Sequence, residues 1–322
     1  MSKREAIRAI AAVAIVTAMV AAAEAFREQE IVFPEIMALA TGALVAPRRS
    51  WNVGPLRMVA LIAACSTAGV LIVRYIPLQP WLKAALAVAA AQTMLPLTRT
   101  TFAPMISAAV LPVILETESW VYPAASTILT AAIVFTRYAF ERAKLCEPEP
   151  FRPEPLPSRA EVPAIAKRAV IGSSWTAASV ALGCPFCAAP PLLVAFTELT
   201  RTSCPARTKP VRAVALISAC ALAGVCARGV FAEAFHLPIA LAAACAASLA
   251  IAAMRKLNMF LPPAGAMAIL PMLIPARQLT LFPFETALGA ISLTAIALAA
   301  FRSPNQSTTP PQTKQHQTKT RC

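Results

Sequence analysis

Residues 55–70 read PLRMVALIAACSTAGV, and residues 210–225 read PVRAVALISACALAGV. The two stretches align without a gap, and eleven of the sixteen positions are identical. Each is an apolar run that starts with a proline and carries a cysteine and a glycine at matching positions. Apolar composition alone does not keep a proline, a cysteine and a glycine in register, so the chain contains a duplicated unit.

A second pair of stretches extends the repeat toward the carboxyl end of each unit. PMISAAVLPV at 104–113 aligns with PAGAMAILPM at 263–272, and both prolines, one alanine and one leucine match. Further on, Tyr122-Pro123 corresponds to Phe282-Pro283. A Pro- and Glu-rich stretch separates the units, and the carboxyl end is polar. We therefore divide the chain into a first membrane repeat (1–145), a Pro-rich cytoplasmic linker (146–163), a second membrane repeat (164–302) and a disordered tail (303–322).

The composition is that of an integral membrane protein. Of the 322 residues, 58% are hydrophobic and only 14% are charged, which leaves too little polar surface for a soluble domain. Eight apolar runs approach the length needed to cross a bilayer, about 17 to 25 residues. They are Ala- and Leu-rich and do not alternate, so we predict an all-α, polytopic transmembrane helical bundle. The runs are 7–25, 56–76, 81–97, 121–136, 170–183, 211–232, 237–254 and 283–300.

The charge of the chain predicts its topology. The net charge of +14 would indicate nucleic acid in a soluble protein, but here the basic residues lie at the ends of apolar runs. If each half has six membrane segments and the amino terminus is cytoplasmic, nearly all basic residues fall on the cytoplasmic side. We therefore predict a multi-pass plasma-membrane protein with both termini in the cytoplasm, two repeats of the same orientation and no nucleic-acid partner. The basic residues outside are Arg27, Arg74, Lys83, Arg228 and Arg277.

The first apolar run also resembles a signal peptide. Lys3 and Arg4 precede an apolar core, and Ala-Glu-Ala at 23–25 resembles a cleavage site. The second repeat has Lys167 and Arg168 before an apolar run at the same place, where a signal peptide cannot lie. We therefore expect residues 7–25 to form a retained helix.

Two short apolar segments in each half indicate where a ligand binds. Residues 34–47 and 103–115 are too short to span comfortably, each starts at or beside a proline, and 190–199 and 262–274 repeat the pattern. Short, proline-interrupted segments at matching positions of two halves are typical of a transporter's binding site, and a helix amino terminus favours an anion. We predict broken or re-entrant segments that line a pathway for a small solute.

The predicted substrate-binding residues flank these segments and supply cations, hydroxyls and close backbone approach. They are Glu35, Arg99, Thr100, Thr101, Pro104 and Ser107 in the first half, and Arg255, Asn258, Pro262, Pro263 and Gly265 in the second. The alternative interpretation is that the basic residues only anchor the topology and that the hydroxyls pack helices. Glu35 is either a buried carboxylate that carries protons or cations or an ordinary acid in the first turn of a helix.

Residues 254–266, MRKLNMFLPPAGA, resemble the signature of the HPP family of membrane proteins, in which a Met-Arg step precedes His-Pro-Pro-Ala-Gly-Ala. Leu261 stands at the position of the family's name-giving histidine, and the first half has Phe102-Ala103-Pro104 instead of the motif. The resemblance implies that each half is one HPP helical unit. It also implies small-anion transport, because HPP members of plastids and cyanobacteria are associated with nitrite.

Two alternatives to transport of a solute remain. Cys184 and Cys187, in a CxxC pair that our topology places near the outer surface, could exchange disulfides, form a structural disulfide or simply pack. The chain could also be a membrane scaffold or sensor without transport activity.

The chain offers little for metal or enzyme chemistry. It has two histidines, His236 and His316, no aspartate, and neither a phosphate-binding glycine loop nor a Ser/His/Asp set. We expect no metal, no cofactor and no enzymatic activity. The expected partners are the lipid bilayer and a small solute, with an anion as the favoured class, and assembly into a homo-oligomer is left open.

Overall fold

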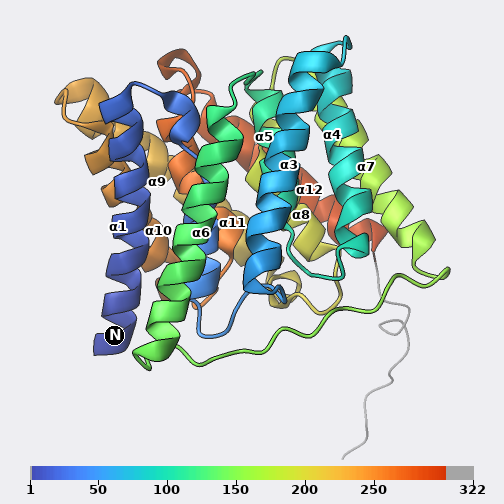
Figure 1. Cartoon of the computed structure of the whole chain (residues 1–322). Helices are drawn as coiled ribbons and strands as arrows, with labels where there is room; N and C mark the ends of the chain where they lie inside the picture. The colour runs from blue at the N-terminus through green and yellow to red at the C-terminus, as the bar shows by residue number, and fades with distance from the viewer. Residues whose placement is uncertain (1, 302–322) are drawn as a thin grey trace, which may run out of the picture.

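The computed structural model describes residues 2–301 as a bundle of helices without a strand, which confirms the all-α prediction (Figure 1). The tail predicted at 303–322 lies outside the described residues. The helices are α1 (Lys3–Phe26), α2 (Glu35–Ala40), α3 (Pro55–Tyr75), α4 (Pro80–Leu97), α5 (Pro104–Ile114), α6 (Val121–Arg142), α7 (Val162–Ala181), α8 (Pro190–Leu199), α9 (Pro210–Arg228), α10 (Ile239–Lys256), α11 (Pro262–Ile269) and α12 (Phe282–Ala300).

Each predicted long apolar run forms one long helix. Five of these helical spans are long and apolar enough to cross a membrane. The other three predicted runs form α4, α6 and α7, which complete eight long helices among residues 2–301. The chain is therefore a multi-pass membrane protein. The five spans are Lys3–Phe26, Pro55–Tyr75, Pro210–Ala234, Ile239–Lys256 and Phe282–Ala300.

The four short segments also form helices, two of them with an irregular last turn. A wider π-type turn, η2 (Thr41–Val45), continues α2, and a tighter 3₁₀ turn, η6 (Leu270–Met272), continues α11. Every residue of α2 and α11 is buried, and α5 and α8 are buried almost throughout. The contacts of α2 with α11, of α5 with α8 and of α8 with α11 place these segments together at the centre of the bundle.

The first helix of each half packs against a helix of the other half. Helix α1 packs against α10 of the second half, and α7 packs in the same way against α4 of the first half. Glu24, in the last turn of α1, accepts hydrogen bonds from the backbone N–H groups of Ile239 and Ala240, at 2.6 and 2.9 Å. An acid at that end of α10 satisfies N–H groups that have no partner within the helix. The halves therefore form one interlocked body.

Two glycines that match between the repeats have the same structural role in each half. A Cβ added to Gly69 of α3 would lie 2.4 Å from the carbonyl oxygen of Ala109 in α5. A Cβ added to Gly224 of α9 would lie 2.2 Å from the carbonyl oxygen of Ala268 in α11. Because these residues align pairwise between the repeats, each glycine lets a long helix pack directly on the backbone of a short one.

Both halves have the same orientation. Arg255, at the end of α10, pairs with Glu5, at the start of α1, at 3.4 Å, and Lys167 Nζ at the start of α7 donates to the carbonyl of Ala300, at the end of α12, at 2.6 Å. Helices α1 and α7 thus begin on one face of the bundle, and α6 and α12 end there. We call it the basic face, and the linker between the halves runs along it (Figure 1).

Candidate functional site

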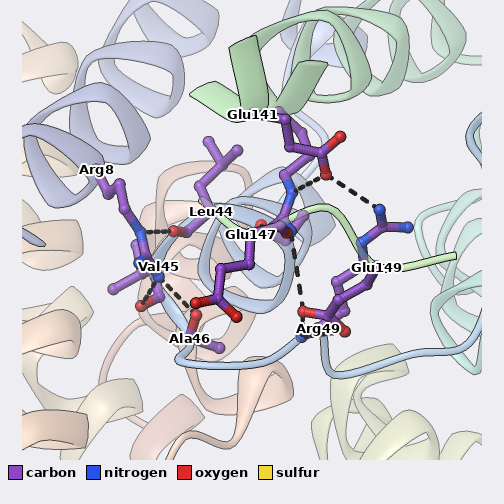
Figure 2. Close-up of polar contacts among 10 residues, drawn as sticks. Arg8, Leu44, Val45, Ala46, Arg49, Glu141, Glu147 and Glu149 are labelled. Carbon is purple, nitrogen blue, oxygen red and sulfur yellow. Dashed lines mark hydrogen bonds and ion pairs between the residues drawn. The ribbon is translucent and has the colours of Figure 1, made fainter. Parts of the chain in front are cut away.

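Arginines bind the carbonyl end of the short segment formed by α2 and η2. Arg8 of α1 donates to the carbonyls of Leu44, Val45 and Ala46, the last two at 2.7 and 2.6 Å (Figure 2). Arg137 of α6 donates to the carbonyl of Ala43 at 2.7 Å. The last carbonyls of a helix lack partners within it and carry its partial negative charge, so two guanidinium groups satisfy and neutralise this end.

A smaller ionic network supports the same end of α2. Arg137 also pairs with Glu141 at 2.7 Å, and Glu141 accepts a second bond from Arg49 at 3.1 Å. The backbone N–H of Arg49 donates to Glu149 in the linker at 3.1 Å (Figure 2). The linker is therefore attached to the bundle by specific contacts.

The carbonyl ends of two short helices in the second half are bound in the same way. Arg207 donates to the carbonyl of Leu199, at the end of α8, at 2.6 Å. Arg228 donates to the carbonyls of Pro271 and Ile274, just after α11, at 2.5 and 2.6 Å. Arg8 and Arg207 lie on the basic face, whereas Arg228 lies at the opposite end of α9. Helices α2 and α8 thus point their carbonyl ends to the basic face, and α11 points its carbonyl end away from it.

Three of the four short helices in the described part of the chain have few free N–H groups at their amino ends. Pro104, Pro190 and Pro262 start three of these helices and have no N–H. The N–H groups that follow bind carbonyls one turn back, as Ile106 does with Ala103 at 2.9 Å and Ala264 with Leu261 at 3.0 Å. At these helix starts prolines and 3₁₀-type bonds therefore leave few N–H donors for an anion.

A vestibule of about 580 Å³ opens on the basic face between the two halves. The loops after α2 and α8 form its walls, and the loops before α5 and α11 contribute Thr101 and Pro262. The rim is joined across the halves by Trp51, whose indole Nε1 donates to Glu198 Oε1 at 2.8 Å. The vestibule therefore leads from the basic face to the starts of the central short helices.

The lining of the vestibule is positively charged. Its basic residues are Arg48, Arg49, Arg201 and Lys209, and Glu198 is its single acid. Within residues 2–301, Arg49 alone among the four basic residues forms a salt bridge, with Glu141. Uncompensated positive charge in a concave, partly desolvated space attracts anions.

A second cavity, of about 280 Å³, adjoins the vestibule, and Thr101 and Arg201 line both. It also contains Thr100, Arg168 of α7, and Glu154 of the linker. The Nε atom of Arg168 is buried and has no hydrogen-bond partner in the described structure. Glu154 and Glu161 balance Arg168 and Arg201 in its lining, and the linker closes this cavity from the side of the basic face.

Four of the predicted site residues line these cavities. Thr101, Asn258 and Pro262 lie in the vestibule, and Thr100 and Thr101 lie in the second cavity. Thr101 Oγ1 accepts a hydrogen bond from the backbone N–H of Asn52 at 2.8 Å, so its position is held by the loop that forms the vestibule wall. These four stay candidates for solute contact.

Two predicted basic residues have other contacts. Arg99 and Asn258 occupy equivalent positions after α4 and α10, where both have left-handed backbone, with φ of 56° and 47°. Arg99 is exposed, and its Nε donates to the carbonyl of Glu154 in the linker at 2.9 Å. Arg255 pairs with Glu5. Arg99 thus follows the end of α4 and contacts the linker, and Arg255 contacts the start of α1, both on the basic face.

The remaining predicted residues lie deeper, among the short helices. Glu35, at the start of α2, is 1% exposed, and Ser107 of α5 is fully buried and donates to Glu35 Oε1. Gly265 of α11 packs on Met37, where an added Cβ would lie 3.1 Å from Cγ. Pro104 and Pro263 are buried in the first turns of α5 and α11. Among these residues the structure joins Glu35 and Ser107 directly.

The residues missed by sequence reasoning are the basic groups after α8 and in α7. In the sequence, Arg201 and Lys209 lie in a stretch that resembles any positively charged cytoplasmic loop. Arg168 likewise resembles one of the basic residues that mark the cytoplasmic end of a membrane helix. Only the packing of the halves shows that Arg201 and Lys209 line the vestibule and that Arg168 and Arg201 line the second cavity.

Cys184 and Cys187 are both free thiols in the described structure. Cys187 is buried against α12, where a Cβ on Gly289 would lie 2.1 Å from its carbonyl oxygen, and that carbonyl accepts from Trp175 Nε1 at 2.9 Å. The surroundings of Cys187 are those of a packing residue. No group of three or more His, Cys, Asp or Glu residues gathers within residues 2–301.

The comparisons with known proteins concern mainly the second half. Residues 206–310 match the model of the HPP transmembrane region. The match starts in the loop after α8, contains α9 to α12 and so includes the Pro-Pro-Ala-Gly-Ala step at 262–266. It confirms the resemblance read from that motif. Neither the search of curated proteins nor that of solved structures found a match to this chain.

Proposed function

We propose that this HPP-family membrane protein is a secondary transporter of a small anion, which enters from the basic face through the vestibule. The observation that carries the proposal is the vestibule's uncompensated charge. Arg48, Arg201 and Lys209 line it and form no salt bridge with any residue in the range 2–301, and it extends to Thr101, just before α5, and to Pro262, the first residue of α11. A pathway that leads to short broken helices between two repeats is typical of transporters.

We propose the nitrite class of small oxyanions as substrates, since the HPP resemblance implies it and the vestibule's hydroxyl and amide groups suit it. Thr101 and Asn258 add polar side chains beside the arginines. An oxyanion accepts charge-assisted hydrogen bonds from guanidinium groups, which are stronger than neutral ones. On this proposal the protein moves its solute without chemical change and is not an enzyme.

We further propose that the basic face is cytoplasmic and that the membrane is the plasma membrane. The support is the distribution of charge within residues 2–301: Arg27, Arg74 and Arg228 lie at the opposite ends of α1, α3 and α9, while most other basic residues of this range lie on the basic face. Cytoplasmic loops of membrane proteins carry this excess of Lys and Arg.

The test is uptake of isotopically labelled nitrite into proteoliposomes that contain the purified full chain. Arg201→Gln and Lys209→Gln together should lower the initial rate roughly tenfold at low salt, or about 1.4 kcal/mol, and high salt should shrink the difference because it screens the vestibule. The matched control is Arg212→Gln, which removes an exposed positive charge from the start of α9 outside the vestibule.

Two results would contradict the proposal. Wild-type uptake no faster than that of protein-free liposomes would exclude nitrite transport. An equal loss in the Arg212→Gln protein would show that surface charge in general, rather than the vestibule, sets the rate. Uptake that survives Cys184→Ser and Cys187→Ser would separate transport from the thiol-redox alternative.

A further inference from the structure

Glu35 is a carboxyl group enclosed by the centre of the bundle. It is 1% exposed, and within residues 2–301 it is the single acidic side chain among the buried charged residues. Oε1 accepts a hydrogen bond from Ser107 Oγ, whereas Oε2 is buried and has no partner. A buried charge without a compensating partner is costly, so such a carboxyl group in a membrane protein indicates a functional role.

The groups that face Glu35 are nearly all neutral. Helix α5 contributes Ser107, and α6 contributes Tyr122, whose hydroxyl donates to the carbonyl of Ala108 at 3.1 Å. The part of α11 that packs on α2 has no titratable residue, and α1 contributes Met19, whose sulfur accepts from the N–H of Phe33. Arg8 of α1 and Arg137 of α6 bind the other end of the α2 segment, as described above, and Arg27 at the end of α1 is exposed. Within residues 2–301, no cation forms a salt bridge with Glu35.

The second repeat has lost this polar group as a unit. Ser107 aligns with Ala266, and Tyr122 aligns with Phe282. The start of α8, residues 190–193, reads PPLL and has no acid. Phe282 and Tyr122 have the same place in the packing, since each forms an edge-to-face pair with a phenylalanine of its own half, Phe186 and Phe33 respectively. The same scaffold therefore folds with or without these polar atoms, and their presence in the first repeat is not a requirement of packing.

Glu35 also lies close to the vestibule along the short helices. The vestibule ends at Pro262, and Gly265, one turn further along α11, packs on Met37, two residues after Glu35. Neither of the two cavities reaches Glu35 itself, so a proton could reach it only if the central helices moved.

From this geometry we propose that Glu35 binds the proton that is carried together with the anion. The inference rests on the proposed function and adds its coupling ion. In each cycle the Glu35 carboxylate takes up one proton on the side where the anion enters, becomes a neutral carboxyl group, and releases the proton on the other side. One monovalent anion and one proton then cross together, and no net charge moves.

The test compares wild type with Glu35→Gln in proteoliposomes with labelled nitrite, after subtraction of uptake by protein-free liposomes. With an acidic exterior, wild type should accumulate nitrite above its external level, and an imposed membrane potential should not change the rate. Glu35→Gln should still exchange internal for external nitrite, but its pH-driven accumulation should be at least tenfold lower than that of wild type. Its residual uptake should depend on the potential because only the anion moves.

A second variant is a control for misfolding of Glu35→Gln. Glu35→Leu, Ser107→Ala and Tyr122→Phe together reproduce the apolar character of the second repeat and should fold and behave as Glu35→Gln does. Accumulation by either variant at the wild-type level would overturn the proposal. Loss of exchange by a folded Glu35→Gln protein would also overturn it, because Glu35 would then serve the anion pathway and not the proton.

An independent measurement separates this inference from the transport proposal. Infrared difference spectra of wild type against Glu35→Gln should contain the band of a protonated carboxyl group, and addition of nitrite should shift its titration toward higher pH. A band absent at every pH from acid to neutral would refute proton binding at Glu35, whether or not nitrite is transported. Absence of nitrite uptake by wild type, with the band present, would refute the transport proposal instead.

Discussion

Trp51 Nε1 donates a hydrogen bond of 2.8 Å to Glu198 Oε1, and this bond joins the loop after α2 to the end of α8. The ring of Trp51 also covers Gly42, where an added Cβ would lie 2.5 Å from it. One side chain thus ties the first half to the second at the rim of the vestibule.

Replacement of Trp51 by Phe should destabilise the protein. It removes a hydrogen bond to an acidic group, a loss of about 1.5–3 kcal/mol, and leaves space over Gly42. The melting temperature in detergent should fall by several degrees, whereas Trp81→Phe, at an exposed position at the start of α4, should leave it unchanged. An unchanged melting temperature for Trp51→Phe would contradict the role given to this bond.

Alanine at either aligned glycine should disrupt the repeat in which it lies. In Gly69→Ala and Gly224→Ala the new methyl group meets a backbone carbonyl at 2.4 or 2.2 Å, and overpacking of this kind typically costs about 1–3 kcal/mol. We expect lower yields of folded protein and a lower melting temperature. Gly229→Ala is the control, because nothing lies within 4 Å of its Cβ position. Equal behaviour of all three variants would show that the close helix contacts are not limiting.

Loss of Arg137 should destabilise the protein because the residue is buried and donates to Glu141 and to the carbonyls of Ala43 and Glu147. Arg137→Ala removes these bonds, and a hydrogen bond to a charged group contributes about 1.5–3 kcal/mol. Arg142→Ala, which removes an exposed arginine from the same helix end, should change little. Denaturation monitored by circular dichroism compares the two, and similar midpoints would contradict this prediction.

Cys204, which lines the vestibule, should react with thiol reagents from the basic face. Burial, and to a lesser extent the charge of Glu198, raises the pKa of its thiol. The thiolate is the reactive form, so labelling should be slow at neutral pH and accelerate as the pH rises toward the raised pKa. The measurement uses a membrane-impermeant maleimide on vesicles of known orientation and a variant with Cys204 as its single cysteine.

The matched control for Cys204 is a variant with Cys184 alone, at the opposite face of the bundle after α7. It should be labelled from the other side of the membrane. Labelling of both variants from one side would show that the proposed topology is wrong. Labelling of Cys204 from the extracellular side would reverse the assignment of the basic face.

Much of the fold was predictable because the length of an apolar run and the positions of prolines determine where a helix begins and ends, and both can be read from neighbouring residues. The stretch of eleven identities at 55–70 and 210–225 indicated the repeat, and the prolines at 104 and 262–263 indicated where short helices begin. The all-α fold, the eight long helices and the four short central ones follow from such patterns. The candidate site was less accessible, because Arg201 and Lys209 resemble ordinary loop charges until the second half closes over the first.

The sequence by itself determined that this protein is a duplicated helical membrane unit, since a bilayer demands long apolar helices and duplication leaves aligned residues. The tertiary structure decided which polar groups face one another. It assigned Arg99 and Arg255 to contacts with the linker and with α1, and it brought Ser107 to Glu35 from 72 residues away in the chain. The physical reason is that hydrogen bonds and charge act over a few ångströms in space, and helices that are distant in sequence supply the two partners.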